Sequence, residues 1–439
     1  MRRVKNWDDI FEGKKITVVG LGLLGRGVGD VAFLARHGAD IIVTDLKTEE
    51  ELAVSVEQLR EFSNITFVFG EHRMEDFQNR DFIVKGPVVP SDSPYILEAK
   101  KNGIPIKMSA SWFAELAAIP VVGVTGTRGK TTTTYMLHAI MNEAGMHVLL
   151  GGNIRGVSTL SLLDTVTKDS VALLELDSWQ CWGFGEAKFS PHIAVFSTFM
   201  QDHMDYYQNN SARYLEDKAY IFLNQESSDT LVLGEQAYGA VTSAYGKHIQ
   251  SHVVEASPDT FPKEWELNVL GEHNKANAAC ALEAARALGI DDEISKKALE
   301  AFTGVPSRLE LVHEVHGIKF YNDTTATTPD ATFVALRALG SEKKNIILIM
   351  GGADKGLPVD VLRELIPQYT KKVIYLAGSG TEKLGVGESH QTLESAFVEA
   401  LKEAQEGDIV LLSPAFASFG MFKNEFDRGD QFNALVAKL

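Results

Sequence analysis

A glycine-rich segment that ends in a lysine and two threonines carries the strongest chemical signal in the sequence. It reads Gly123-Val-Thr-Gly-Thr-Arg-Gly-Lys-Thr-Thr132 and overlaps an apolar, strand-like run at 119–124. Glycines let backbone N–H groups converge on a polyphosphate, and the N-terminus of a following helix adds a favourable dipole. Lys130 would reach the outer phosphates and Thr131 would bind Mg²⁺. The segment therefore predicts a nucleotide-binding loop, with a helix that begins near Thr133.

The strict P-loop spacing is not met, because Val124 stands where that pattern requires glycine. The alternative interpretation is a glycine-rich turn between a strand and a helix with an incidental lysine. The order of strand, loop, Gly-Lys-Thr-Thr and helix favours phosphate binding.

A second glycine-rich turn, Gly20-Leu-Gly-Leu-Leu-Gly25, directly follows the strand-like run 15–19. Asp45 ends the next strand-like run, at 41–45. This is a dinucleotide-type fingerprint in its proper context, and read alone it predicts NAD. Beside the other phosphate loop it predicts a nucleotide diphosphate. An NAD-dependent dehydrogenase and a turn that only packs a helix on a sheet remain alternatives.

Two side chains behind apolar runs are candidate Mg²⁺ ligands. Glu175 lies at the end of the run 171–176, and His203 follows the run 193–197. A carboxylate at the C-terminal end of a parallel strand faces the crevice where ligands bind. Each residue alone fits a structural role as well, but together with a phosphate loop they predict an Mg²⁺ site.

Further polar residues open a helix or follow strands. Asn274 and Asn277 stand at the start of an alanine-rich helical stretch at 275–288. The sequence favours a helix cap for them, and binding of a base is the alternative. In the last third of the chain, polar loops follow three strand candidates. Each loop could form part of a functional site or could only make a turn. They contain residues 322–330, 351–356 and 413–420.

Short apolar runs that alternate with helical stretches predict an α/β protein with mainly parallel sheets. At 439 residues the chain is too long for one ordinary core. We predict a Rossmann-like domain at 1–109, a P-loop-type central domain at 110–304 and a Rossmann-like C-terminal domain at 305–439. The remaining strand-like runs are 65–68, 82–84, 346–350, 373–376 and 409–412.

The formal net charge of −17 argues against nucleic acid and anionic membranes as partners. The basic start has no apolar region behind it, and the apolar stretch 16–24 is too short to cross a bilayer. We therefore expect a cytoplasmic protein without membrane insertion, and a monomer. The only two cysteines, Cys181 and Cys280, are expected to be buried thiols.

Taken in order, the motifs resemble those of the Mur ligases over essentially the whole chain. They are Gly-Thr-x-Gly-Lys-Thr-Thr, Gly-Gly-Asn-Ile, Glu-Leu-x-Ser-Trp-Gln, Asp-His-Met-Asp, Tyr-x-x-x-Lys, Gly-x-His-Asn-x-x-Asn, Arg-Leu-Glu, Asn-Asp, Gly-Gly-x-Asp-Lys and Ser-Pro-Ala. The last motifs and the short first domain are most similar to the glutamate-adding branch. The resemblance implies a UDP-sugar domain, a central ATPase and a C-terminal domain for the amino acid. It also implies that ATP activates the carboxylate of UDP-N-acetylmuramoyl-L-alanine, which glutamate then attacks, in peptidoglycan precursor synthesis.

Carried over position by position, the resemblance implies a role for each matching residue. ATP would contact Gly126, Thr127, Arg128, Gly129, Lys130, Thr131, Thr132, Asn274, Asn277, Arg308 and Asp323. The UDP-substrate would contact Gly22, Leu23, Leu24, Asp45, Leu46, Lys47, Asn153, Ser178 and Gln180. Glutamate would contact Thr325, Lys355, Ser418 and Phe419. Two Mg²⁺ ions would be held by Thr131, Glu175, His203 and a carbamylated Lys218, and the catalytic residues would be Lys130, His203 and Lys218.

Several positions depart from the family's pattern. They are Arg128 for asparagine, Arg155 for glycine, Asp177 for serine, Ser307 for histidine, Thr325 for lysine, and Asn424-Glu-Phe426 for Asn-Phe-Glu. None removes a phosphate or metal ligand, but several touch substrate recognition. The identity and chirality of the amino acid therefore stay open. Other Mur ligases and folylpolyglutamate-type ligases remain alternative assignments.

Overall fold

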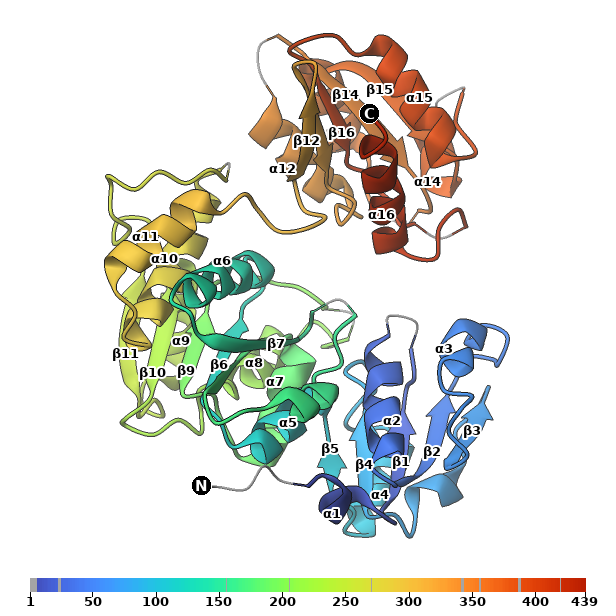
Figure 1. Ribbon diagram of the computed structural model, residues 1–439, viewed down its shortest axis with the longest axis vertical. Helices are drawn as coiled ribbons and strands as arrows, with labels where there is room; N and C mark the ends of the chain where they lie inside the picture. The colour runs from blue at the N-terminus through green and yellow to red at the C-terminus, as the bar shows by residue number, and fades with distance from the viewer. Residues whose placement is uncertain are drawn as a thin grey trace. The chain divides into compact units, whose positions relative to one another are not determined.

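The framework consists of three β-sheets built mainly of parallel strands (Figure 1). The computed structural model describes residues 6–439 except 23, 24, 155, 205, 270, 341, 342, 355, 356, 386, 387 and 419, and only the backbone of 361. The chain forms two compact units, Met1–Glu266 with Glu272–Glu300, and Leu267–Gly271 with Ala301–Leu439. The predicted α/β class is confirmed, whereas the domain boundaries at 109 and 304 stay predictions.

The first sheet has the strand order β3-β2-β1-β4-β5, and every neighbouring pair is parallel. Its strands are β1 (Lys15–Val19), β2 (Asp40–Asp45), β3 (Ile65–Phe69), β4 (Phe82–Lys85) and β5 (Ile106–Lys107). Its helices are α1 (Asp8–Phe11), α2 (Arg26–Arg36), α3 (Ala53–Glu57), η1 (Met74–Phe77) and α4 (Pro94–Lys101). Chain order reverses between β1 and β4, so the loops after these two strands border a crevice.

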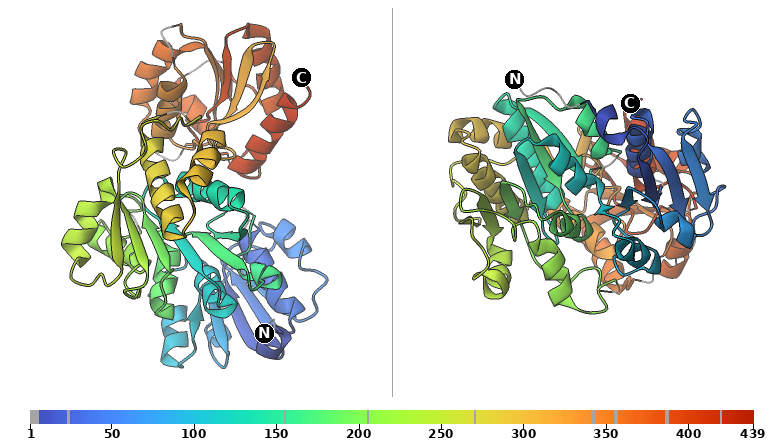
Figure 2. Two further views of the ribbon diagram at one scale, coloured as in Figure 1. Left: turned by 60° about the vertical axis from the view of Figure 1, so that its left-hand side comes forward. Right: turned by 90° about the horizontal axis from the view of Figure 1, so that it is seen from below.

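The second sheet has the order β11-β10-β9-β6-β8-β7 and is entirely parallel. Its strands are β6 (Val121–Thr125), β7 (His147–Gly152), β8 (Ser170–Glu175), β9 (Ile193–Phe196), β10 (Thr230–Gly234) and β11 (His252–Ala256). Its helices are α5 (Ser109–Ala117), α6 (Lys130–Glu143), η2 (Leu160–Thr165), α7 (Ser178–Ala187), α8 (Ser211–Ala219), α9 (Glu235–Tyr245), α10 (His273–Ala287) and α11 (Asp292–Ala301). All five residues of β6 are buried, as its unbroken apolar run predicts for a central strand. Helices α6 and α10 pack side by side against this sheet (Figure 2).

A continuous apolar core joins the first two sheets, since one cluster of buried residues runs from Phe11 through Phe113 to Val241. Close backbone contact supports it. A Cβ atom on Gly29 of α2 would lie 2.5 Å from the Cβ of Ser158, so no larger residue fits there without movement. Trp7 Nε1 also donates a hydrogen bond to the carbonyl of Leu163 at 3.1 Å. These contacts fix the loops of the first sheet relative to those of the second.

The third sheet, in the other unit, has the order β12-β13-β16-β14-β15. Its strands are β12 (Glu310–Val315), β13 (Ile318–Asn322), β14 (Ile346–Gly351), β15 (Thr370–Leu376) and β16 (Ile409–Leu412). Its helices are α12 (Pro329–Leu339), α13 (Asp360–Tyr369), α14 (Ser379–Leu384), α15 (Leu393–Glu403) and α16 (Glu425–Val436). At one edge β12 pairs antiparallel with β13, while the other neighbouring strands of this sheet are parallel, in agreement with the prediction of mainly parallel sheets.

Over the part of the chain that the structure describes, no helix is both long and apolar enough to cross a bilayer. The two cysteines are buried, free thiols, as expected.

Candidate active site

The loop after β6 is shaped by two glycines that no other residue can replace. Gly126 has φ +146°, and a Cβ atom on it would lie 2.2 Å from Ser197 Oγ. Gly129 has φ +81°, and a Cβ atom there would lie 2.3 Å from Asn277 Oδ1. The helix α6 begins directly at Lys130, three residues earlier than predicted, because Gly129 in the left-handed conformation serves as its N-cap. Lys130 and Thr131, both partly exposed, therefore stand at the N-terminal end of a helix, a position that suits a phosphate.

The segment after β9 holds this loop from one side. The backbone N–H of Thr127 donates to the carbonyl of Thr198 at 2.7 Å, and the N–H of Arg128 donates to Thr198 Oγ1 at 2.8 Å. The hydroxyl of Ser197 donates to the Arg128 carbonyl at 2.7 Å. Lys130 folds back over the loop, with Nζ 3.0 Å from the carbonyl oxygen of Gly126. These hydrogen bonds within the protein fix the path of the loop.

Lys218 lies beneath the same loop and is only 1% exposed. Its Nζ donates to the carbonyl of Gly126 at 2.8 Å, and it stands 4.9 Å from the centre of the Tyr214 ring. Both residues are on α8 and share its buried face, as their spacing predicts. Burial, with the nearby Lys130 cation, lowers the pKa of Lys218 to about 7. A neutral amine is therefore available close to the phosphate loop.

Glu175 ends β8 and is buried beside the phosphate loop, because its strand neighbours β6 directly. Asn153 donates from Nδ2 to Glu175 Oε1 at 3.2 Å. Arg26, the first residue of α2, donates from Nη1 to Asn153 Oδ1 at 2.6 Å. This chain of contacts leads from the glycine turn of the first sheet to the predicted metal ligand of the second.

His203 belongs to an aromatic cluster next to the loop. Its ring centre lies 4.8 Å from that of Trp179 and 6.4 Å from that of Tyr214. The backbone of His203 has φ +55°, which is uncommon for a residue other than glycine and is typical of functional sites. The imidazole is 44% exposed. It is therefore held in place and remains accessible to a ligand.

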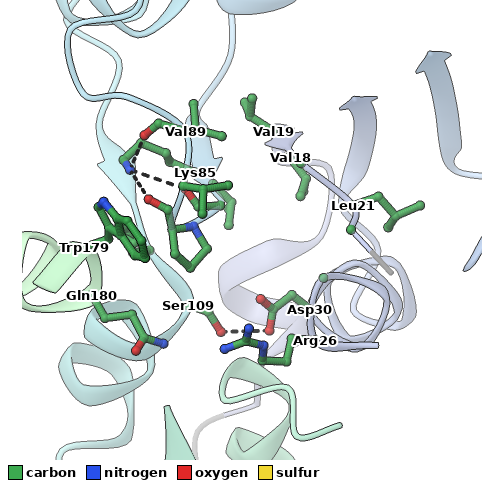
Figure 3. Close-up of a pocket in the computed structure, with 18 of the residues that line it drawn as sticks. Val18, Val19, Leu21, Arg26, Asp30, Lys85, Val89, Ser109, Trp179 and Gln180 are labelled. Carbon is green, nitrogen blue, oxygen red and sulfur yellow. Dashed lines mark hydrogen bonds between the residues drawn. The ribbon is translucent and has the colours of Figure 1, made fainter. Parts of the chain in front are cut away.

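One cavity of about 930 Å³ brings residues of the first two sheets together (Figure 3). Its wall includes the first glycine turn, Lys130 at the end of the second, and Trp179 and His203 of the aromatic cluster. Of the predicted site residues, it contains Gly22, Asp45, Leu46, Lys47, Lys130, Asn153, Gln180 and His203. Leu23 and Leu24, like Arg155, lie outside the described residues. Ser178 is buried at the start of α7 and does not line the cavity.

Asp45 organises the glycine turn of the first sheet. Its Oδ2 accepts the backbone N–H of Leu21 at 2.9 Å and that of Gly22 at 3.3 Å, and its Oδ1 accepts the N–H of Lys47 at 3.0 Å. The carboxylate thus has a structural task at the cavity wall, and of its four acceptor positions one, on Oδ1, remains for a ligand.

Three matches to known families cover most of the chain. They are the Mur ligase MurD-like N-terminal domain at 14–108, the Mur ligase middle domain at 124–262 and the Mur ligase glutamate ligase domain at 307–416. The UDP-N-acetylmuramoylalanine–D-glutamate ligase of Roseiflexus sp. (strain RS-1) is 36% identical over 97% of this chain and 98% of that protein. The enzyme of the same name from Borreliella burgdorferi (strain ZS7) is 35% identical over 98% and 99%. The chain belongs to the Mur ligase family.

Solved structures show the same fold. The UDP-N-acetylmuramate-alanine ligase MurC of Thermotoga maritima matches with a TM-score of 0.59 at 20% identity, over 97% of this chain and 99% of that one. MurF of Acinetobacter baumannii matches with a TM-score of 0.59 at 18% identity, over 84% and 93%. Membership of the Mur ligase family decides against the dehydrogenase alternative for the first glycine turn.

In this Mur ligase, the two asparagines of α10 do not cap the helix, so that expectation was wrong. The helix begins at His273, and both side chains lie within it. Asn277 Nδ2 donates to Asn274 Oδ1 at 3.0 Å, and the Asn277 amide packs against Gly129. The pair therefore lies directly behind the loop that follows β6.

The remaining predicted residues of the Mur ligase lie in the unit with the third sheet. Asp323 follows β13, and burial raises its pKa to about 7, although the N–H of Leu309 and the hydroxyl of Ser413 donate to it at 3.1 and 2.7 Å. Arg308 adds a nearby positive charge. Thr325 donates from its hydroxyl to the carbonyl of Ser307 at 2.9 Å.

The structure describes some of the residues that are predicted to bind glutamate. Ser418 is buried in the loop after β16, while Lys355 and Phe419 lie outside the described residues. In the same region Arg428 of α16 is fully buried and donates to the carbonyls of Thr324 and Phe416 at 2.9 and 3.3 Å. It ties the loops after β13 and β16 together, and the sequence analysis missed it.

Sequence analysis also missed two charged residues in the wall of the 930 Å³ cavity, Asp30 and Lys85. Asp30 Oδ1 accepts hydrogen bonds from Ser158 at 2.6 Å and Ser109 at 2.8 Å, and burial raises the pKa of Asp30 to about 6. The signal was present, because each is a charged residue within an otherwise apolar run, Val28–Leu34 and Phe82–Lys85. Such residues are buried only when something in the fold satisfies them.

Proposed function

We propose that this Mur ligase uses ATP to join D-glutamate to the carboxylate of UDP-N-acetylmuramoyl-L-alanine, with ADP and phosphate as products. The observation that carries the proposal is the single cavity shared by the glycine turn of the first sheet, Lys130 and His203. A UDP-sugar held at the first turn can extend its far end to the phosphate loop only if both border one space. The names of the relatives that align over nearly their whole length support glutamate of D configuration.

The chemistry requires two steps on this scaffold. A carboxylate is a poor electrophile, so its oxygen first attacks the γ-phosphorus of ATP and ADP leaves. The amine of glutamate then attacks the acyl carbon, phosphate leaves, and the amine loses a proton. Lys130 and the helix N-terminus of α6 are placed to neutralise the charge that develops on the transferred phosphoryl group.

The donor set beside the loop fits Mg²⁺, a cation that prefers oxygen ligands and keeps several waters. Thr131 offers a hydroxyl and Glu175 a buried carboxylate, and His203 adds a nitrogen. Among the residues the structure describes, no three His, Cys, Asp or Glu side chains converge as a ready metal cluster. We propose that carbamylated Lys218 supplies a further anionic oxygen. Mg²⁺, when bound, would shield the phosphate charges during transfer.

The other roles follow the family pattern. We propose that Gly126, Thr127, Arg128, Gly129, Thr132, Asn274, Asn277, Arg308 and Asp323 bind ATP, and that Thr325, Lys355, Ser418 and Phe419 bind glutamate. The substrate roles of Gly22, Leu23, Leu24, Asp45, Leu46, Lys47, Asn153, Ser178 and Gln180 are proposed on the same basis. We further propose a monomer that acts in the cytoplasm, where ATP is supplied.

The proposal is tested by measuring ADP release with UDP-N-acetylmuramoyl-L-alanine and either D- or L-glutamate. We expect release only when ATP, the UDP-substrate and D-glutamate are all present. NAD and NADH serve as controls and should neither be consumed nor protect the protein against heat. Release with L-glutamate instead, or with a different UDP-muramoyl acceptor, would redirect the assignment within the family.

A separate prediction concerns Lys355, which supplies a point charge for a glutamate carboxylate. Because Thr325 replaces the family's lysine, binding of glutamate should depend heavily on Lys355. We expect Lys355→Ala to raise the KM for glutamate by ~10-fold or more, the effect of losing one charged contact, while the KM for ATP changes little. Steady-state kinetics with each substrate varied in turn check this. An equal rise in both KM values would indicate a structural role.

A further inference from the structure

Lys85 is a buried lysine in the wall of the cavity, with only 3% of its surface exposed. It ends β4, and its Nζ donates to three carbonyl groups of the loop that follows. The distances are 3.3 Å to Gly86, 3.3 Å to Pro87 and 2.6 Å to Val89 (Figure 3). An ammonium group has three N–H donors. In this geometry all three are used within the loop itself.

The loop that Lys85 holds, residues 86–90, is a wall of the cavity: all five of its residues line it. Its path is tight, since the N–H of Gly86 donates to the carbonyl of Val19 at 2.9 Å and a Cβ atom on Gly86 would lie 2.9 Å from that same oxygen. The carbonyls of Gly86, Pro87 and Val89 all turn toward the Lys85 ammonium group. Without the ammonium group they would lack their buried donor, and the loop would have to rearrange.

Lys85 also links this loop to the second sheet. Its Nζ lies 4.9 Å from the centre of the Trp182 ring on α7, an attractive cation–π distance. The first turn of the same helix carries Trp179 and Gln180, which also line the cavity, with Trp179 beside Lys85 (Figure 3). One side chain therefore contacts both the loop 86–90 and the helix α7, two parts of the chain that line the cavity. Burial lowers the pKa of Lys85 to about 8, which agrees with a group withdrawn from solvent.

We propose that Lys85 is a positioning residue for the UDP-substrate, which shapes the loop 86–90 from behind instead of binding the substrate's phosphates. The proposal rests on the proposed function of the cavity. It differs from the usual interpretation of a lysine in a nucleotide site, a cation that contacts phosphate. The two roles make opposite predictions for arginine at this position.

Lys85→Arg and Lys85→Met are the deciding variants. The planar fork of a guanidinium cannot direct its donors at three carbonyls that converge on one nitrogen. We therefore expect both variants to raise the KM for the UDP-substrate by about tenfold or more, with the KM for ATP within about twofold of wild type, as for a misplaced binding surface. A phosphate-binding lysine would instead tolerate arginine, which binds phosphate well.

Lys100→Met is the matched control. Lys100 lies over the same Trp182 ring at 5.3 Å but is partly exposed, pairs with Glu186 at 3.3 Å and does not line the cavity. It should keep wild-type KM values. The inference is overturned if Lys85→Arg has a wild-type KM for the UDP-substrate, if the KM for ATP rises equally, or if both Lys85 variants fail to fold. If only Lys85→Met fails to fold, Lys85→Arg decides. A wild-type protein without UDP-substrate-dependent ADP release would contradict the proposed function instead.

Discussion

Replacing Lys218 with alanine should remove nearly all ADP release, and short carboxylates such as acetate or formate should restore part of it. We expect a loss of about 100-fold or more, typical when one charged group at a phosphoryl-transfer site is lost. Steady-state ADP release with and without added carboxylate measures both effects. The rescue is the informative part, because a lysine that only supplied a positive charge would not be replaced by an anion.

The physical reason lies in the surroundings of Lys218. The amine is buried under the phosphate loop, and burial together with Lys130 lowers its pKa to about 7. In the proposed modification the neutral amine would add to CO₂: an N–C bond would form, one C=O bond would become a C–O⁻ group, and the nitrogen would lose a proton. The product would carry its negative charge near Lys130. An anionic oxygen there is a ligand that Mg²⁺ prefers.

Two controls separate carbamylation from a purely structural role. Depleting CO₂ should slow the wild type but not the carboxylate-rescued variant, since the latter no longer needs the modification. Carboxylates should give no rescue of Lys130→Ala, because an anion cannot replace a cation. Full activity of Lys218→Ala, or an unmodified amine in a structure with bound ATP and Mg²⁺, would rule the idea out.

The parts of the site that were predictable are those whose chemistry is local in sequence. The run from Gly123 to Thr132 places glycines, a lysine and a helix start within ten residues, and each has a physical reason to be there. The order of the strands in a sheet could not be predicted in this way, since it depends on which apolar runs pair. That Glu175 neighbours the phosphate loop follows from β8 lying next to β6, a contact that no local pattern records.

Burial of charged groups was the least predictable feature. Helix α8 carries Arg213, Glu216 and Asp217 around Lys218, so its pattern indicates a solvated surface. Only its packing under the loop after β6 shows that Lys218 is enclosed. The prediction that Asn277 caps its helix failed for a related reason. Its side chain packs against Gly129, a residue far away along the chain, where the missing side chain of glycine leaves room for it.

The antiparallel edge of the third sheet was missed because β12 lacks an apolar run. Its residues Glu310–Val315 mix polar and apolar side chains, and each is partly or fully exposed, as befits an edge strand. A search for buried parallel strands passes over such a segment. The tight turn at His316-Gly317, where both residues have positive φ, was the available signal for a hairpin.

Lys130→Ala should lower turnover by ~100-fold or more, the usual cost of removing one donor that stabilises a transition state. In the structure Lys130 Nζ lies 3.0 and 3.1 Å from the carbonyls of Gly126 and Thr127, a position from which it can turn to a phosphate. Its loss should leave the loop intact. Gly126, Gly129 and the hydrogen bonds from Ser197 and Thr198 set the backbone there.

The expected signature is therefore a fall in kcat with an unchanged melting temperature and an unchanged affinity for the UDP-substrate. Lys168→Ala provides a surface control, since that lysine is 90% exposed in a turn before β8 and should behave as wild type. Lys130→Arg should recover only part of the rate, because a guanidinium keeps the charge but not the compact ammonium geometry. Near-wild-type turnover of Lys130→Ala would contradict the assignment of the loop, since a phosphoryl group could then be transferred there without the one cation that heads the helix.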